Sequence, residues 1–319
     1  MLRSLVIRLI TSVFVFLVIA IGLFALVRLA PGDPIDMMVP PEVAGEDRVA
    51  YVARVRERFG LDQPLPVQFV RWFGGLLTGD LGYSYSSGRA VSELLSERLG
   101  PTVLLMGSAL LLGLIIAVPA GIIAAKKRNT IIDQAITNFS IIAIAVPSFF
   151  LAMLAIYIFA VQLGVLPSAG MYSSGRTDIP DLLRHMVLPV TLLGLTVAAP
   201  FTRYVRSGML EELNKDYVRT IHAKGGTPAR ALRHGLRNSL ISLVTVLALY
   251  IPSFLSGAVI MEQVFAWPGM GQLAIRALTQ RDYPVIIGFG LYVAVLVLVC
   301  NLIADLLYSV VDPRVRTGR

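Results

Sequence analysis

Charged side chains that could act on a partner are concentrated in one stretch, Arg203 to Asn238, which lies between long apolar runs. From Met209 to Lys224, apolar residues recur at three- and four-residue steps, with charged residues between them. The apolar set is Leu210, Leu213, Tyr217, Val218 and Ile221, and the charged set is Glu211, Glu212, Lys215, Asp216 and Arg219. This spacing predicts one amphipathic helix with a charged outer face. Its chemistry is ionic and hydrogen-bonding contact with water or a soluble partner, rather than bond making.

A pair of glycines, Gly225 and Gly226, follows this helix, and Thr227-Pro228 comes next. Glycine adopts a left-handed conformation cheaply at a helix C-terminus, and threonine followed by proline is typical of a helix start. The sequence therefore predicts a hinge and a second short helix from Ala229 to Asn238. Two short helices joined by a hinge form a lever that a soluble partner could push. The alternative is an ordinary loop that packs on lipid headgroups.

Residues for catalysis or metal binding form no recognised pattern. The sequence has no Gly-Lys dipeptide, and so no Walker A phosphate loop, and it has neither a His-Glu-x-x-His nor a Gly-x-Ser-x-Gly motif. The histidines are scattered at His185, His222 and His234, and the single cysteine, Cys300, lies in an apolar run. We therefore predict no catalytic site, no metal site and no bound cofactor.

Membrane-spanning helices must position these residues. The chain has 319 residues, is 56% apolar and has a mean hydropathy of +0.74. Six apolar runs have roughly the 20 residues that a helix needs to cross the hydrocarbon core. They are Leu9 to Val27, Thr102 to Ala125, Ile131 to Leu163, His185 to Thr202, Leu240 to Met261 and Pro284 to Val310. The predicted fold class is an all-α polytopic membrane protein with both termini on one side.

The distribution of charge predicts the orientation in the membrane. The N-terminus, the loops after the second and fourth spans and the C-terminus carry an excess of Lys and Arg, whereas the opposite loops are net acidic. Basic excess marks cytoplasmic loops, so both termini are predicted to be cytoplasmic. The net charge of +8 therefore reflects topology and does not indicate nucleic-acid binding. Mid-depth positions hold no charge, which argues against an ion-coupled transporter.

An outer segment, residues 30–100, follows the first transmembrane helix, residues 1–29. It is expected to contain a charged helix from Glu46 to Phe59 and an apolar, aromatic helix from Pro66 to Leu77. The second of these suits the outer membrane interface, and a small subdomain packed on itself fits equally well. Residues 101–311 are predicted to form the core that contains segment 203–238, and residues 312–319 a cytoplasmic tail.

Motifs along nearly the whole chain resemble one family. They include Pro31-Gly32-Asp33-Pro34, Gly79-Asp80-Leu81-Gly82, Val146-Pro147-Ser148-Phe149, Asp216-Tyr217-Val218-Arg219-Thr220, Ala223-Lys224-Gly225, Trp267-Pro268-Gly269 and Arg281-Asp282-Tyr283-Pro284. In this order they resemble the dipeptide and oligopeptide permeases of bacterial ABC importers, and in particular the first of the two membrane subunits. The chain departs from the usual pattern at Ile221-His222 and from Gly235 to Ser239, and these departures leave the hinge glycines intact.

The resemblance implies a type I ABC-importer permease fold with six transmembrane helices, in the bacterial inner membrane. It implies that the cytoplasmic segment docks on an ATPase. The residues expected to couple to it are Asp216, Tyr217, Arg219, Thr220, Ala223, Lys224, Gly225, Gly226, Arg233 and Arg237. Expected partners are a second homologous permease, two cytoplasmic ATPase subunits that bind ATP and magnesium, an extracytoplasmic peptide-binding protein and the lipid bilayer.

The resemblance also implies a cargo and an outer gate. The expected cargo is a dipeptide or oligopeptide, with glutathione, a nickel complex or an oligosaccharide as alternatives. In the resembled importers the outer segment Met261 to Tyr283 folds near the mouth of the pathway, and this implies a gate formed by Glu262, Phe265 and Trp267. The alternative is a plug that only packs between helices. A secondary transporter and a membrane-embedded enzyme are the rival classes.

Overall fold

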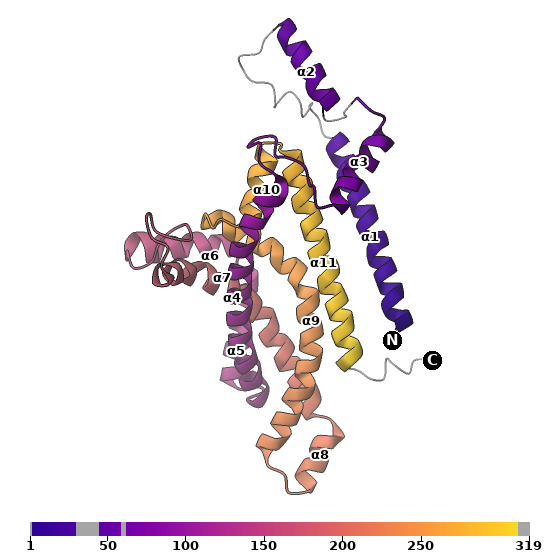
Figure 1. Ribbon diagram of the computed structural model, residues 1–319. Helices are drawn as coiled ribbons and strands as arrows, with labels where there is room; N and C mark the ends of the chain where they lie inside the picture. The colour runs from indigo at the N-terminus through magenta and orange to yellow at the C-terminus, as the bar shows by residue number, and fades with distance from the viewer. Residues whose placement is uncertain (1, 30–44, 59–61, 312–319) are drawn as a thin grey trace. The chain divides into compact units, whose positions relative to one another are not determined.

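The computed structural model describes residues 2–29, 45–58 and 62–311. The motif Pro31-Gly32-Asp33-Pro34 and the tail 312–319 lie outside the described residues. The described chain is helical, with one isolated antiparallel bridge between Tyr83 and Ala90 (Figure 1). It divides into two compact units, Met1–Gly100 with Gln272–Leu298 and Pro101–Gly271 with Val299–Arg319.

The first unit is built on an aromatic contact between two of its helices. It contains α1 (Leu2–Leu29), α2 (Glu46–Arg58), α3 (Leu65–Leu77), the start of α4 (Val91–Lys126), most of α10 (Met270–Thr279) and the first part of α11 (Tyr283–Val311). Phe24 of α1 packs against Phe69 and Trp72 of α3, with ring centroids 5.4 and 5.6 Å apart. Helix α3 thus packs on α1, and it leaves Val70 and Leu77 exposed on its other side.

A buried carboxylate joins two of the sequence motifs inside this unit. Asp282 is 2% exposed, and its Oδ2 accepts hydrogen bonds from the hydroxyls of Ser84 and Ser86 at 2.6 and 2.7 Å. The backbone N–H of Tyr85 donates to Oδ1 at 3.0 Å. Several donors compensate a buried charge that would otherwise be costly. The turn before α4 is therefore fixed to the turn before α11.

The second unit packs its helices through small residues. It contains α4 from Pro101 onward, α5 (Ile131–Ala145), α6 (Ser148–Ala155), the π-helix η2 (Ile156–Gln162), α7 (Ile179–Leu213), α8 (Asp216–Ala223) and α9 (Pro228–Val264). A Cβ on Gly113 of α4 would lie 2.7 Å from Cβ of Val197, and one on Gly121 would lie 2.6 Å from Cβ of Val205. These two glycines therefore allow α4 and α7 to approach closely, as is common between membrane helices.

The membrane spans agree with the predicted fold class, with one correction. Among the described residues, α1, α4, α7 and α11 are long and apolar enough to cross a membrane. The run Ile131 to Leu163 was expected to be one long helix, and this is wrong, because α5 and the α6–η2 helix meet at 95°. Val146 before Pro147 is extended, with φ −85° and ψ 127°, since the residue before a proline is pushed out of the helical region. The fifth predicted span, Leu240 to Met261, lies within α9, and several of its side chains are outside the described residues.

Candidate functional site

The cytoplasmic segment begins with a break between two helices. Helix α7 ends at Leu213, Asn214 and Lys215 form a tight turn, and α8 starts at Asp216. The expected single helix from Met209 to Lys224 is therefore wrong. Lys215 is extended, with φ −74° and ψ 153°, and Asn214 belongs to the residue types that favour turns over helix interiors. The break sets α8 as a separate short helix at the tip of its unit, between the end of α7 and the start of α9 (Figure 1).

The two hinge glycines have different structural roles. Gly225 has a φ of +73°, which strains any residue with a side chain. Gly226 donates its N–H to the carbonyl of Ile221 at 2.8 Å, and Gly225 donates to His222 at 2.9 Å. This pair of bonds is a Schellman motif. A Cβ on Gly226 would lie 2.7 Å from the Ile221 carbonyl oxygen, so this position needs glycine for close approach.

Thr227 and Pro228 start the next helix as the sequence predicts. The backbone N–H of Arg230 donates to the Thr227 hydroxyl at 3.4 Å, and Pro228 occupies the first helical position. The helix does not stop at Asn238, however. It continues as α9 to Val264, over 37 residues, so the expected short second helix is wrong. At 1.5 Å per residue, α9 is about 55 Å long and contains Pro252, so the hinge is joined directly to one long helix.

Glu212, which the sequence pattern places on the charged outer face, is instead largely buried and holds three helices together. Glu212 of α7 accepts hydrogen bonds from the Tyr217 hydroxyl of α8 at 3.0 Å and from the Asn238 amide of α9 at 3.1 Å, and it also pairs with Lys215. The hydrogen bond to Glu212 raises the pKa of Lys215, and burial together with the same carboxylate raises the pKa of Tyr217. Both donors therefore stay protonated at neutral pH.

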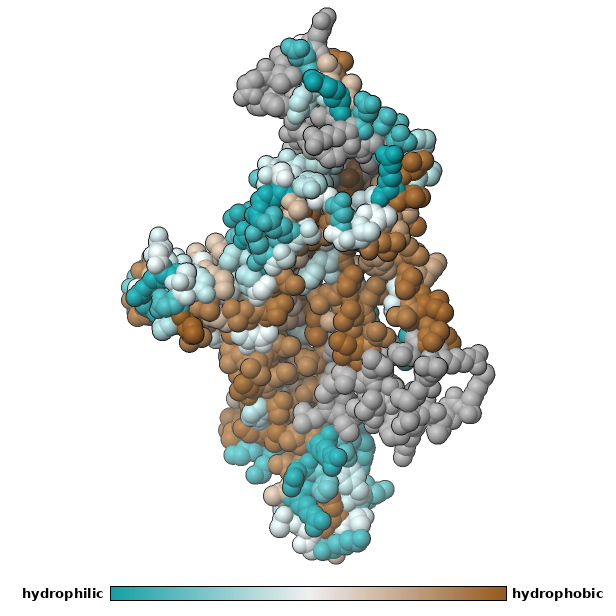
Figure 2. Space-filling view, in the orientation of Figure 1, coloured by the Kyte–Doolittle hydropathy of each residue, from teal (hydrophilic) through white to brown (hydrophobic). Residues whose placement is uncertain are grey.

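The remaining coupling candidates are displayed outward from this tip. Val218 is 6% exposed and anchors α8 on its unit, while Tyr217 and Gly226 are partly buried. The exposed candidates are Asp216, Arg219, Thr220, Ala223, Lys224, Gly225, Arg233 and Arg237. In Figure 2 this tip is teal, whereas the helices of the same unit above it are brown. The arrangement offers a polar, charged surface on a hinged helix that a soluble partner can reach.

A second ionic contact ties the base of α7 to α5. Arg206 donates to the two carboxylate oxygens of Asp133 at 2.6 and 2.8 Å, and Asp133 is 3% exposed. The backbone N–H of Asn129, in the α4–α5 turn, also donates to Asp133 at 2.9 Å. Such bidentate pairs are among the stronger ionic contacts. This pair was missed by sequence analysis, because its two members lie on different helices with no shared spacing.

The outer-gate candidates lie together in a buried hydrogen-bonded knot. Glu262, Phe265 and Trp267 are 0%, 2% and 0% exposed. Glu262 accepts from the Thr102 hydroxyl at 2.6 Å and from the Gly271 N–H at 2.7 Å. The Trp267 indole donates to the Pro101 carbonyl at 2.9 Å. A gate role remains a prediction, and in this conformation the three side chains pack between helices.

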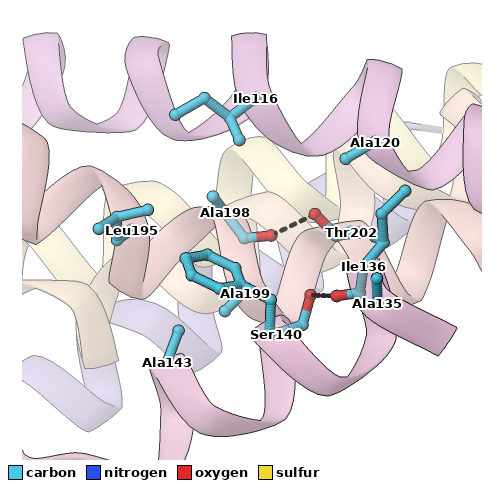
Figure 3. A pocket seen from close by; sticks show the side chains of 11 residues that line it. Ile116, Ala120, Ala135, Ile136, Ser140, Ala143, Leu195, Ala198, Ala199 and Thr202 are labelled. Atoms are coloured by element: carbon cyan, nitrogen blue, oxygen red, sulfur yellow. Dashed lines mark hydrogen bonds between the residues drawn. The ribbon is translucent and has the colours of Figure 1, made fainter. Parts of the chain in front are cut away.

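An apolar pocket of about 410 Å³ lies between α4, α5 and α7 in the same unit (Figure 3). Its lining is mostly alanine, isoleucine and leucine, with Phe139. The two hydroxyls on its wall are already satisfied, since Ser140 donates to the Ile136 carbonyl and Thr202 to the Ala198 carbonyl. The pocket therefore offers apolar contact without directed polar recognition. Among the described residues, no group of His, Cys, Asp or Glu side chains could hold a metal ion.

Comparison with known proteins gives matches over nearly the whole chain. Residues 117–317 match the family described as binding-protein-dependent transport system inner membrane component, and residues 1–106 match the N-terminal region of such membrane components. The oligopeptide transport system permease protein AppB of Bacillus subtilis (strain 168) is 42% identical over 97% of each chain. The glutathione transport system permease protein GsiC of Salmonella paratyphi A is 37% identical, also over 97% of each chain.

Solved structures give a match to the fold. An inward-facing form of the MetNI methionine ABC transporter has a TM-score of 0.55 and 20% sequence identity. The match covers 69% of this chain and 96% of that one. At this identity the likeness carries the fold alone.

Proposed function

Because the chain belongs to the family of binding-protein-dependent transport system inner membrane components, we propose that it is a permease subunit of an ABC importer that takes up dipeptides or oligopeptides. The observation that carries this proposal is the match of 42% identity to an oligopeptide permease over almost the full length of both chains. The all-helical fold, with several membrane-spanning helices, supports it. Because the sequence has no Walker A motif, we propose that partner subunits bind the ATP.

The hinged tip is the proposed docking site for the ATPases. It combines an exposed, charged α8 with a glycine turn and a direct connection to the long helix α9. Movement of a partner docked on α8 would be transmitted to α9 through the short glycine turn between the two helices. ATP and magnesium would be bound by two cytoplasmic ATPase subunits, and a second homologous permease would complete the pathway. An extracytoplasmic binding protein would deliver the cargo to the outer end.

The proposed location is the bacterial inner membrane, with both termini in the cytoplasm. Support comes from the basic excess in the segments assigned to that side, which include the tip around α8. In this orientation the hinge faces the compartment that contains ATP. The knot of Glu262, Phe265 and Trp267 is then at the outer end, where we propose that it closes the pathway.

Isolation from native membranes tests the proposal against its rivals. The chain should co-purify with two ATPase subunits and a second permease, and reconstituted uptake should require ATP and be blocked by vanadate. A secondary transporter would take up cargo without nucleotide hydrolysis. A membrane enzyme would convert substrate in the absence of any partner. Uptake by the isolated chain alone would contradict the proposal.

Glutathione is the second candidate cargo, because a glutathione permease is 37% identical over the same share of the chain. Both cargoes are peptide-like, and the permease sequence does not separate them. Calorimetric titration of the cognate binding protein with an alanine tripeptide and with glutathione distinguishes the two candidate cargoes. Tight binding of the tripeptide alone supports peptide as the cargo. Tight binding of glutathione alone shows that glutathione is the cargo.

A further inference from the structure

A second pocket, of about 530 Å³, lies between α5 and α7 and differs in character from the apolar one. Its lining residues are Thr137, Pro200, Arg203, Tyr204, Arg206 and Ser207, so polar and apolar surface are mixed. Its α7 residues lie between Pro200 and Ser207, on both sides of Thr202, where the predicted fourth span ends. The pocket therefore lies at the boundary between the hydrocarbon core and the aqueous phase.

One cation of this pocket is neutralised, and one is not. Arg206 is held by the buried carboxylate of Asp133. Arg203 is exposed and makes no hydrogen bond or ion pair with any of the described residues. The hydroxyls of Tyr204 and Ser207 likewise have no hydrogen-bond partner within the described part of the chain. The pocket therefore presents one uncompensated guanidinium and two unused hydroxyl donors, which together fit an anionic oxygen group.

Further positive charge is fixed close to this pocket. Asn129 donates its N–H to the same Asp133 carboxylate that Arg206 binds, which holds the α4–α5 turn against the base of α7. The basic run before that turn, Lys126-Lys127-Arg128, is exposed. Farther along α7, Glu211 and Glu212 share Lys215, so these three residues have a net charge of −1, which is smaller than the charge of the basic run. The surroundings of the pocket are thus net positive.

We propose that this pocket binds the phosphate of an anionic phospholipid from the cytoplasmic leaflet, with Arg203 as its main cation. Three observations favour a lipid headgroup over a free carboxylate. The pocket lies at the predicted membrane boundary, its wall is half apolar, and a basic run precedes the turn that Asp133 ties to α7. Basic pockets between transmembrane helices on the cytoplasmic side bind such headgroups, and tyrosine is enriched at this depth. The bound lipid would add a second bridge between α7 and the α4–α5 turn.

Native mass spectrometry of the complex from nanodiscs of phosphatidylcholine and phosphatidylglycerol tests the site. The parent complex should retain a phosphatidylglycerol molecule that Arg203→Gln loses, and Arg203→Lys should keep most of it. In titrations of phosphatidylglycerol, removal of one cation should weaken retention about fivefold. The matched control is Arg230→Gln, which removes an exposed arginine from the start of α9 and should leave retention unchanged.

Two results would overturn the proposal. Undiminished phosphatidylglycerol retention by Arg203→Gln is the first. The second is an Arg203→Gln variant that no longer discriminates, in reconstituted uptake, between an alanine tripeptide and its C-terminal amide, because the pocket would then hold cargo. If Arg203→Gln is not produced, the double variant Tyr204→Phe with Ser207→Ala, which removes both unused hydroxyls from the pocket, takes its place with the same criteria. The lipid measurement needs no transport, so its outcome is independent of the proposed function.

Discussion

At the scale of single residues, two carboxylates have roles that their sequence positions conceal. Glu212 is 12% exposed in its side chain and joins α7, α8 and α9, whereas its neighbour Glu211 is 76% exposed. The two residues have the same chemistry and opposite environments. They therefore form a matched pair in which the effect of burial and bonding can be measured directly.

Glu212→Gln should loosen the tip of the second unit. The change removes the negative charge that three donors share, and charge-assisted hydrogen bonds contribute about 1.5 to 3 kcal/mol each. A loss of 1 to 2 kcal/mol in local stability corresponds to roughly 5- to 30-fold more opening. Limited trypsin digestion at Arg219 and Lys224 should accelerate by that factor. Glu211→Gln should change the rate little, because exposed pairs contribute about 0 to 1 kcal/mol. Equal rates for both variants would show that Glu212 does not hold the tip.

The outer knot gives the second prediction at this scale. If Glu262 and Trp267 take part in the gate, Glu262→Gln and Trp267→Phe should assemble at parental levels and lower peptide uptake several-fold. If the knot only packs between helices, both variants should lower the yield of assembled complex and leave uptake per complex unchanged. Quantifying assembled complex and uptake in the same vesicles separates these outcomes. Parental yield combined with parental uptake would remove the gate role.

At the scale of elements, the sequence predicts features that depend on neighbouring residues, but it does not predict contacts between distant helices. The glycine hinge, the threonine cap and the start of α9 follow from short-range rules, and the structure has all three. The second short helix was expected to end at Asn238 because the polar segment ends there, but no glycine or proline separates Asn238 from the following apolar run, and the helix continues. A bend was considered at every proline within a span, and Pro147 could not be distinguished from Pro189 and Pro200, which stay inside a continuous helix. Asp133–Arg206 was missed because a contact between helices carries no periodic signal.

The hinge itself supplies the prediction for this scale. No atom lies within 4 Å of a Cβ at Gly225, so its substitution is opposed by backbone conformation alone. A left-handed residue with a side chain costs about 1 to 2 kcal/mol, and asparagine tolerates this conformation better than valine. Gly225→Val should assemble and lose most of its ATP-dependent uptake, while Gly225→Asn should keep much of it.

Measurement of uptake and of complex yield in parallel tests the hinge. Gly107→Ala is the control, because Gly107 has open space around it and lies in α4. Undiminished transport by Gly225→Val would show that the left-handed turn is not needed for coupling.

At the scale of the whole molecule, membership in the permease family and the all-helical fold agree with the fold class expected from composition and motifs. The apolar runs were enough to predict this fold class, because only helices or closed barrels satisfy all backbone hydrogen bonds in lipid. Orientation rests on the charge of the loops and is open to a direct chemical test.

Cysteine labelling should separate the two sides of the membrane. In a Cys300→Ser background, Tyr83→Cys and Lys224→Cys each place an exposed thiol at a described surface position. A membrane-impermeant maleimide should label Tyr83→Cys in spheroplasts and Lys224→Cys only in inverted vesicles. The control is labelling of both variants after detergent solubilisation. The reverse pattern would place the hinge outside, where no ATPase could reach it.

The unbroken length of α9 has a mechanical consequence. Pro252 lies inside this helix, and a proline removes one backbone hydrogen bond and so allows a bend at that point. Thr227 lies at the N-terminal end of α9, and Glu262 lies near its C-terminal end. Under the proposed function, a movement at Thr227 would reach Glu262 through one helix, and Pro252 would be the point at which the two parts of that helix bend relative to each other.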